Sequence, residues 1–190
     1  MLQALFLEDA PPTPSPSTPS SGQWILFFDG ASRGNPGPAG AGAILVHVSA
    51  TQSSVIWAVS AYLGVKTNNE AEYTALIQGL SYCRSRGINC LLIVGDSRFV
   101  LDALRAGRRP RHPRLIPFFQ IAHVLRASLR ECIWRHHRRS YNRMADALAN
   151  WALDHAQSQV FQPPPVVPSS VLKALSSDIG AATLLRDTTE

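Results

Sequence analysis

The stretch ILFFDGASRGNPGPAGAGAILV, residues 25–46, places a charged aspartate, Asp29, directly after an apolar run. Glycine and proline explain the tight connection that follows, because they supply the backbone angles of turns. They do not explain the carboxylate, which stands at the edge of what reads as a buried strand. A carboxylate there is costly unless it is paired, hydrogen-bonded or bound to a metal. The stretch therefore directs attention to other acids that could join Asp29.

On both sides of this stretch, the apolar pattern predicts an α/β fold with a mixed sheet. Three strands joined by Gly/Pro-rich or polar turns come first and predict an antiparallel meander, and two parallel strands follow later. The predicted strands are 24–28, 41–48, 54–63, 90–95 and 132–136. Apolar spacing and bounding glycines predict helices over 69–86, 97–106, 115–129 and 143–155. The pattern favours a five-stranded mixed sheet flanked by helices.

The two ends of the chain differ in composition from the middle. Residues 1–22 are rich in Pro, Ser and Thr, which predicts a disordered segment. Residues 159–190 are Pro-rich, and we expect this tail to be mostly disordered, apart from a short helix at 171–183 without a visible packing partner. Residues 23–158 between them are long enough for one domain with its own core.

The overall charge favours an acidic partner. The 190 residues carry a formal net charge of +5 at pH 7, so nucleic acid is the first partner to expect. The three cysteines are widely spaced and fit neither a disulfide framework nor a zinc pattern. No apolar run approaches the roughly 20 residues of a membrane span, and the first residues lack the basic start of a signal peptide. We therefore expect a soluble, intracellular protein that does not bind membranes.

Four acids on four predicted elements can converge. Asp29 and Asp96 each follow an apolar strand, and parallel neighbouring strands would bring both to one sheet edge. Glu72 lies in the first turn of a helix, and Asp146 near the start of the last helix. Taken singly, each has an ordinary alternative, as a helix cap, a first-turn acid or a solvated helix residue. Together they form a like-charged cluster that suits Mg²⁺ or Mn²⁺, and two such ions can activate water for phosphodiester hydrolysis.

Four segments carry a family resemblance. DGASRGNPGPAGAGAIL, TNNEAEYTALIQGL, GDSRFVLDAL and HHRRSYNRMADALANWA resemble, in order, the motifs of type 1 ribonuclease H, especially its plant and archaeal reverse-transcriptase-like branch. The resemblance spans nearly all of 24–156. It implies a ribonuclease H-like fold and an endonuclease that cleaves the RNA strand of RNA–DNA hybrids with two Mg²⁺ ions. It favours Glu72 over Glu70, so the implied catalytic metal ligands are Asp29, Glu72, Asp96 and Asp146.

The resemblance also implies a loop histidine and a set of substrate-binding residues. His136, ten residues before Asp146, matches the catalytic histidine to which the family attributes proton transfer or product release, and His137 is the alternative. Recognition of the 2′-hydroxyl, which only RNA offers, needs groups that donate and accept hydrogen bonds. The implied substrate-binding residues are Gly30, Ala31, Asn35, Asn68, Asn69, Ser97, Arg139 and Asn142. Turn and helix-cap chemistry is the ordinary alternative for the asparagines and the serine.

An arginine-rich region supports nucleic-acid binding. Between Ser97 and Ala145 there are twelve arginines and two acids. A solvated basic face is the alternative, but arginine suits phosphate binding through its bidentate fork. By resemblance, RAGRRPRHPR, residues 105–114, stands where bacterial relatives carry a basic protrusion, here in a short, proline-interrupted form.

The sequence thus predicts a monomeric endoribonuclease that acts on RNA–DNA hybrids and leaves 5′-phosphate and 3′-hydroxyl ends. The alternative is a retroelement-derived module of the same fold that binds nucleic acid with weak or no catalysis. A 3′–5′ exonuclease of the related fold is disfavoured, because Asp29-Gly30-Ala31 lacks the second acid of that group's Asp-x-Glu pattern.

Overall fold

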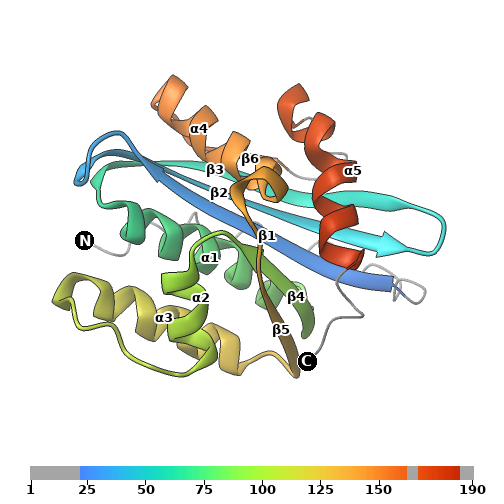
Figure 1. Cartoon of the computed structure of the whole chain (residues 1–190), viewed down its shortest axis with the longest axis horizontal. Coiled ribbons are helices and arrows are strands. Elements are labelled where there is room, and N and C mark those ends of the chain that lie inside the picture. Colours follow the sequence, from blue (N-terminus) through green and yellow to red (C-terminus); the bar gives the residue numbers. More distant parts are fainter. Residues whose placement is uncertain (1–21, 162–166, 185–190) are drawn as a thin grey trace.

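The structure is a computed structural model that describes residues 22–161 and 167–184 (Figure 1). Its strands are β1 (Gly22–Ser32), β2 (Gly37–Ser49), β3 (Ser53–Lys66), β4 (Cys90–Gly95), β5 (Glu131–His136) and β6 (Gln159–Phe161). Its α-helices are α1 (Asn68–Ser85), α2 (Arg98–Arg105), α3 (Ile116–Ala127), α4 (Arg143–His155) and α5 (Ser169–Leu184). Two short 3₁₀ turns, η2 (Pro113–Leu115) and η3 (Arg139–Tyr141), precede α3 and α4.

One mixed sheet forms the centre, with the strand order β5-β4-β1-β2-β3-β6. The predicted antiparallel meander of β1, β2 and β3 is confirmed, and β4 pairs in parallel with both β1 and β5. The expected count of five strands is corrected to six, because Gln159–Phe161 pairs antiparallel with β3. A strand of three residues carries too little periodicity to be recognised in the sequence.

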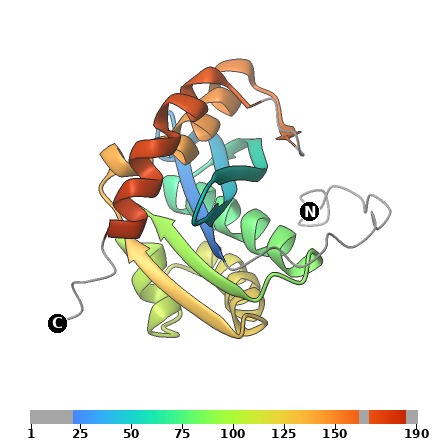
Figure 2. The ribbon, with the colours of Figure 1, turned by 90° about the vertical axis from the view of Figure 1, so that its right-hand side faces the viewer.

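Helices cover both faces of the sheet, as Figures 1 and 2 show. On β1, Leu26 and Phe28 pack in a cluster with α1, α2 and α3, whereas Ile25 and Phe27 pack with α4 and α5. All four side chains are fully buried, as expected for a central strand covered on both sides. Asp29 is the next residue of this strand, so its carboxylate lies at the boundary of the core.

The C-terminal segment differs from the expectation of a mostly disordered tail. Besides β6, it contains the 16-residue helix α5, whose apolar side recurs every three to four residues. Val171, Ala174, Ile179 and Ala182 are buried in the same cluster as Leu148 of α4. The sequence showed the apolar spacing but not the surface that covers it. The predicted disordered segment 1–22 lies outside the described residues except for Gly22, which begins β1.

Within residues 22–161 and 167–184, no helix combines the length and the apolar character needed to cross a bilayer. Cys83, Cys90 and Cys132 are free thiols.

Candidate active site

Three carboxylates from three elements meet at one edge of the sheet. Asp29 comes from β1, Glu72 from α1, and Asp96 directly follows β4; one oxygen of each lies within 4.8 Å of the other two. The parallel register pairs Phe27 of β1 with Val94 of β4. Two residues further along, both strands therefore deliver an aspartate at the same level. The predicted parallel pairing of these strands is confirmed.

Gly30 allows the third carboxylate to reach the other two. A Cβ at this position would lie 2.1 Å from the backbone nitrogen of Glu72, so only glycine lets α1 pack this closely against β1. The backbone N–H of Gly30 also donates a hydrogen bond to the Glu72 carboxylate. The other carboxylate oxygen, Oε2, is buried and has no hydrogen-bond partner among the described residues. A buried carboxylate oxygen without a hydrogen-bond partner is suited to bind a metal ion.

The electrostatics of the cluster oppose its own ionisation. Burial raises the pKa of Asp29 from 3.8 to about 9, and the nearby charges of Asp96 and Asp146 add to the shift. Burial also raises the pKa of Glu72, and repulsion from Asp29 and Asp96 raises it further. Arg139 opposes both shifts. A buried cluster of oxygen ligands with this excess of negative charge fits a hard divalent cation such as Mg²⁺ or Mn²⁺.

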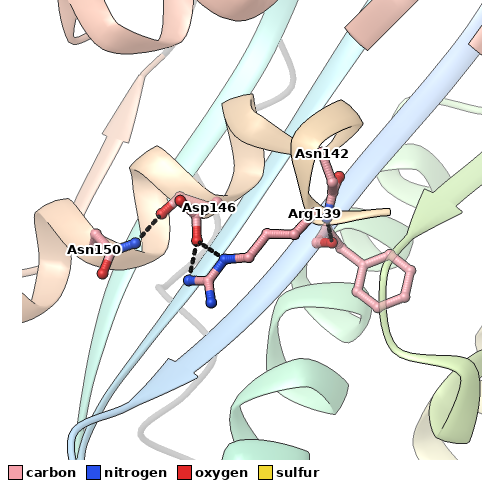
Figure 3. Close-up of polar contacts among 5 residues, drawn as sticks. Arg139, Asn142, Asp146 and Asn150 are labelled. Carbon is pink, nitrogen blue, oxygen red and sulfur yellow. Dashed lines mark hydrogen bonds and ion pairs between the residues drawn. The ribbon is translucent and has the colours of Figure 1, made fainter. Parts of the chain in front are cut away.

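The fourth predicted acid, Asp146, lies in the first turn of α4 (Figure 3), where its charge raises the pKa of Asp29, but it is not one of the three converging carboxylates. Its Oδ1 accepts a hydrogen bond from Arg139 Nε at 2.9 Å, and Arg139 Nη2 forms an ion pair with the same oxygen. Asn150 Nδ2 donates to the Asp146 backbone carbonyl at 2.9 Å. The structure therefore places Arg139, expected to bind substrate, on the fourth carboxylate.

Close backbone contact fixes α4 against the sheet. A Cβ at Gly42 of β2 would lie 2.2 Å from the carbonyl oxygen of Ala145. The Ser60 hydroxyl donates to the Leu148 carbonyl at 2.6 Å. These contacts set the height of the first turn of α4 above β1 and β2, and with it the position of Asp146.

Asn142 lies in the core at the start of α4. Its side chain is fully buried, and Nδ2 donates to the Phe28 carbonyl oxygen at 2.8 Å (Figure 3). It ties the start of α4 to β1 at the residue before Asp29. The structure therefore assigns the Asn142 Nδ2 group to a buried contact with the backbone of β1, and the substrate contact implied by the family resemblance stays a prediction.

The two histidines of the loop after β5 have different surroundings. His136 Nε2 lies 3.0 Å from the backbone carbonyl oxygen of Asp96, and its Nδ1 faces Arg98 Nε at 3.5 Å. His137 is buried, with Nδ1 at 3.3 Å from the Tyr141 carbonyl, and burial lowers its pKa. His136 is thus the histidine placed next to the carboxylate cluster.

The remaining predicted substrate residues gather around the first turns of α1 and α2. The Asn68 backbone N–H donates to Asn35 Oδ1 at 3.1 Å, which joins the β1–β2 turn to α1. Glu70 completes a capping box with Thr67 and so is occupied away from the cluster. Ser97 caps α2. Helix-cap and turn chemistry therefore holds for Ser97 and Asn35, and it leaves their other hydrogen-bonding capacity free for a ligand.

Two hollows are lined by residues at the start of α1. One, of about 210 Å³, is polar and includes Asp29, Gly30, Ala31, Arg33, Asn68, Glu72, Asp96, Arg139 and Asn150. The other, of about 700 Å³, includes Asn35, Thr67, Asn69, Phe99, Arg108, Arg109, Arg111 and Arg114. The consecutive residues Asn68 and Asn69 line one hollow each. A carboxylate pocket therefore adjoins a groove rich in arginine.

Sequence reasoning missed several residues of these hollows. Arg33 and Asn150 line the carboxylate pocket, and Phe99 lines the basic groove. Asn150 follows Asp146 by four residues, a helical spacing that places both on one face and could have indicated it. No comparable signal marks Arg33, which reaches the site from a turn and pairs with Asp154 of α4.

Comparisons with known proteins identify the family of this chain. The reverse transcriptase-like family matches residues 27–152. A bifunctional protein of Mycobacterium tuberculosis is 37% identical over 132 residues, 70% of this chain and 36% of that protein. The chain thus spans about a third of the length of this relative. The solved N-terminal RNase H domain of a protein from that organism superposes with a TM-score of 0.65 at 36% identity, covering 70% of this chain and 99% of that one.

Two further proteins have the same fold. Ribonuclease HI of Halobacterium salinarum is 38% identical over 135 residues, 71% of this chain and 66% of that protein. The crystal structure of RNase H1 from that organism gives a TM-score of 0.64 at 37% identity, covering 70% and 99% of the two chains. A ribonuclease H1 named LC11, solved in complex with an RNA/DNA hybrid, gives 0.62 at 31% identity, covering 70% and 99%. By the extent of the family match and by these relatives, the chain belongs to the reverse transcriptase-like branch of the type 1 ribonuclease H family.

Proposed function

We propose that the protein is an endoribonuclease that hydrolyses the RNA strand of RNA–DNA hybrids, leaving 5′-phosphate and 3′-hydroxyl ends. The observation that carries the proposal is the convergence of Asp29, Glu72 and Asp96, with Asp146 beside them, in a chain of this family. The solved hybrid complex of the related LC11 enzyme supports the choice of substrate. We further propose that the protein acts as a monomer.

The four carboxylates would hold the divalent cations. Asp29, Glu72 and Asp96 offer the converging oxygens, and Asp146 would join them when Arg139 releases its carboxylate. We propose two Mg²⁺ ions, with Mn²⁺ able to replace them, since the donors are all carboxylate oxygens. When bound, the ions supply an activated water and stabilise the leaving oxygen.

The protein's own groups position the reacting strand and handle protons. His136 lies beside Asp96, where its imidazole can take part in proton transfer or product release as the family resemblance implies. The backbone at Gly30 and Ala31 and the amide of Asn68 line the carboxylate pocket, where they can hydrogen-bond the ribose 2′-hydroxyl. Ser97 stands at the start of α2, next to Asp96, and offers a further hydroxyl.

The basic groove suits the rest of the duplex. Arg108, Arg109, Arg111 and Arg114 can pair with phosphates, and Asn35 and Asn69 can position them. Because this groove adjoins the carboxylate pocket at the start of α1, one hybrid can occupy both. We propose that the arginines of the groove bind the phosphates of the hybrid near the cleaved RNA strand.

Cleavage assays test the proposal directly. Labelled RNA–DNA hybrid, single-stranded RNA, duplex RNA and duplex DNA are incubated with Mg²⁺ or Mn²⁺ and wild type, Asp96→Asn or Glu131→Gln. The last variant is a matched control, since Glu131 is an exposed carboxylate at the start of β5. We expect hybrid-only cleavage by wild type and Glu131→Gln, and none by Asp96→Asn.

The alternatives give other results in the same assay. Salt-sensitive binding of the hybrid without cleavage by folded wild type would favour the retroelement-derived binding module. Stepwise shortening of duplex DNA from its 3′ end would favour the exonuclease. Either outcome would overturn the proposed activity.

A further inference from the structure

The first turn of α4 lacks a cap of its own. The first backbone N–H groups of a helix need acceptors from outside the helix. Asn142 occupies the N-cap position, but its side chain makes no capping bond and donates to the Phe28 carbonyl instead. The backbone N–H of Met144, whose residue is fully buried, therefore needs an acceptor from another element.

Asp178 of α5 supplies that acceptor. Its Oδ2 accepts a hydrogen bond from the Met144 backbone N–H at 2.8 Å, and Ser177 Oγ donates to its Oδ1 at 3.3 Å. Asp178 itself is fully buried. A buried carboxylate against a helix N-terminus gains from both the hydrogen bond and the helix dipole. The cap for α4 thus comes from a helix that begins 26 residues after the start of α4.

Helix α5 supports both sides of this junction. Figure 2 shows α5 lying beside α4, and α5 contacts both α4 and the turn η3. Ile179 and Ala182 pack in one apolar cluster with Met144 and Leu148. Asp146 lies two residues after Met144, and its partner Arg139 belongs to η3. The two members of the Arg139–Asp146 pair therefore stand on elements that α5 holds in place.

We propose that Asp178 is a positioning residue for the metal site, because it caps the helix that presents Asp146. This inference rests on the proposed function of Asp146 as a metal ligand. It goes beyond the family comparison, since the family match ends at residue 152, before α5 begins. In this chain, the described C-terminal helix is thus part of the support of the active site.

The test compares three variants of the full chain. Asp178→Ala removes the acceptor, Asp178→Asn retains an oxygen for Met144, and Val171→Ala removes buried α5 packing without touching the cap. Mg²⁺ and Mn²⁺ binding is measured by calorimetric titration, and the Mg²⁺ dependence of hybrid cleavage is measured beside it. We expect Asp178→Ala to weaken metal binding several-fold, and Asp178→Asn and Val171→Ala to bind as wild type does.

Several outcomes would overturn the proposal. Equal weakening in Asp178→Ala and Val171→Ala would show that α5 acts through stability alone. Wild-type metal binding by folded Asp178→Ala would remove the positioning role. If Asp178→Ala does not fold, Asp178→Glu, which displaces the carboxylate by one methylene, replaces it, with the same weakening expected. If wild type binds metal but cleaves no hybrid, the proposed activity fails, while the calorimetric comparison still decides the role of Asp178.

Discussion

At the level of single residues, the ionised form of Asp29 is destabilised by its place in the site. Burial, Asp96 and Asp146 together raise its pKa from 3.8 to about 9. Between pH 3.8 and about pH 9, Asp29 has lost its proton in the unfolded chain, whereas the folded protein without metal still keeps it. The unfolded state then binds fewer protons, so the free energy of unfolding falls as pH rises through this range. A cation bound to the carboxylate would offset that loss.

We therefore expect Mg²⁺ to raise the melting temperature of wild type more at about pH 8.5 than at about pH 6.5. Without metal, Asp29→Asn should be more stable than wild type at the higher pH, because the amide is buried without the proton uptake that folding imposes on Asp29 there. With free Mg²⁺ about tenfold above its Kd, the gain for wild type is roughly 1.4 kcal/mol. Thermal denaturation with and without Mg²⁺ measures both effects. An equal Mg²⁺ shift in Asp29→Asn would contradict Asp29 as a ligand.

Gly30 gives a steric prediction at the same scale. Gly30→Ala would place a Cβ 2.1 Å from the Glu72 backbone nitrogen, so α1 must move away from β1. We expect a loss of about 1–3 kcal/mol in the free energy of unfolding and loss of hybrid cleavage. Gly180→Ala is the matched control, because a Cβ on that residue of α5 meets nothing within 4 Å. Denaturant unfolding and cleavage assays on both variants check this. Full activity of Gly30→Ala would contradict the close packing.

Local patterns revealed some site residues and not others. The motif TNNEAEY distinguishes Glu72 from Glu70, and the structure places Glu72 with Asp29 while Glu70 caps its helix. The core contact of Asn142 could not be predicted, because its partner, the Phe28 carbonyl, lies 114 residues away in the sequence. Long-range contacts of this kind have no local signature.

At the scale of elements, Asn142 joins α4 to β1. Asn142→Ala should leave the Phe28 carbonyl without its buried donor and lower the free energy of unfolding by roughly 1–3 kcal/mol. Because the side chain is fully buried, we expect the KM for hybrid to stay near the wild-type value. Denaturant unfolding and steady-state kinetics separate the two effects. A raised KM with unchanged stability would instead support the substrate contact implied by family resemblance.

Most helices and strands can be predicted from the sequence pattern, but β6 and α5 depend on contacts within the fold. The meander, the parallel strands β4 and β5 and the four predicted helices follow from periodicity, and their bounds agree within a few residues. Strand β6 is too short to show a periodic pattern of apolar residues. It forms because it pairs antiparallel with β3. Helix α5 has a visible apolar face, but only the fold supplies Met144 and Leu148 to cover it. Tertiary contacts therefore determine β6 and α5, which the sequence pattern alone left open.

At the scale of the whole molecule, charge is segregated around the start of α1. The carboxylate pocket holds Asp29, Glu72 and Asp96, and the adjoining groove holds Arg108, Arg109 and other arginines. A net charge of +5 therefore coexists with a locally negative pocket. This separation suits a polyanion that is bound by the groove and presented to cations in the pocket.

The arginines of the groove should determine how hybrid binding depends on salt. Arg109→Ala combined with Arg111→Ala should weaken hybrid binding and reduce the steepness of its salt dependence, by roughly 0.9 in the log–log slope for each phosphate that the variant no longer neutralises. The matched control is Arg84→Ala, in the last turn of α1 and about 25 Å along that helix from the groove. Fluorescence anisotropy with labelled hybrid across a salt series, without divalent metal, measures the slopes. Equal slopes for the double variant and wild type would place the hybrid elsewhere, because the number of released counterions reports directly how many phosphates the protein neutralises.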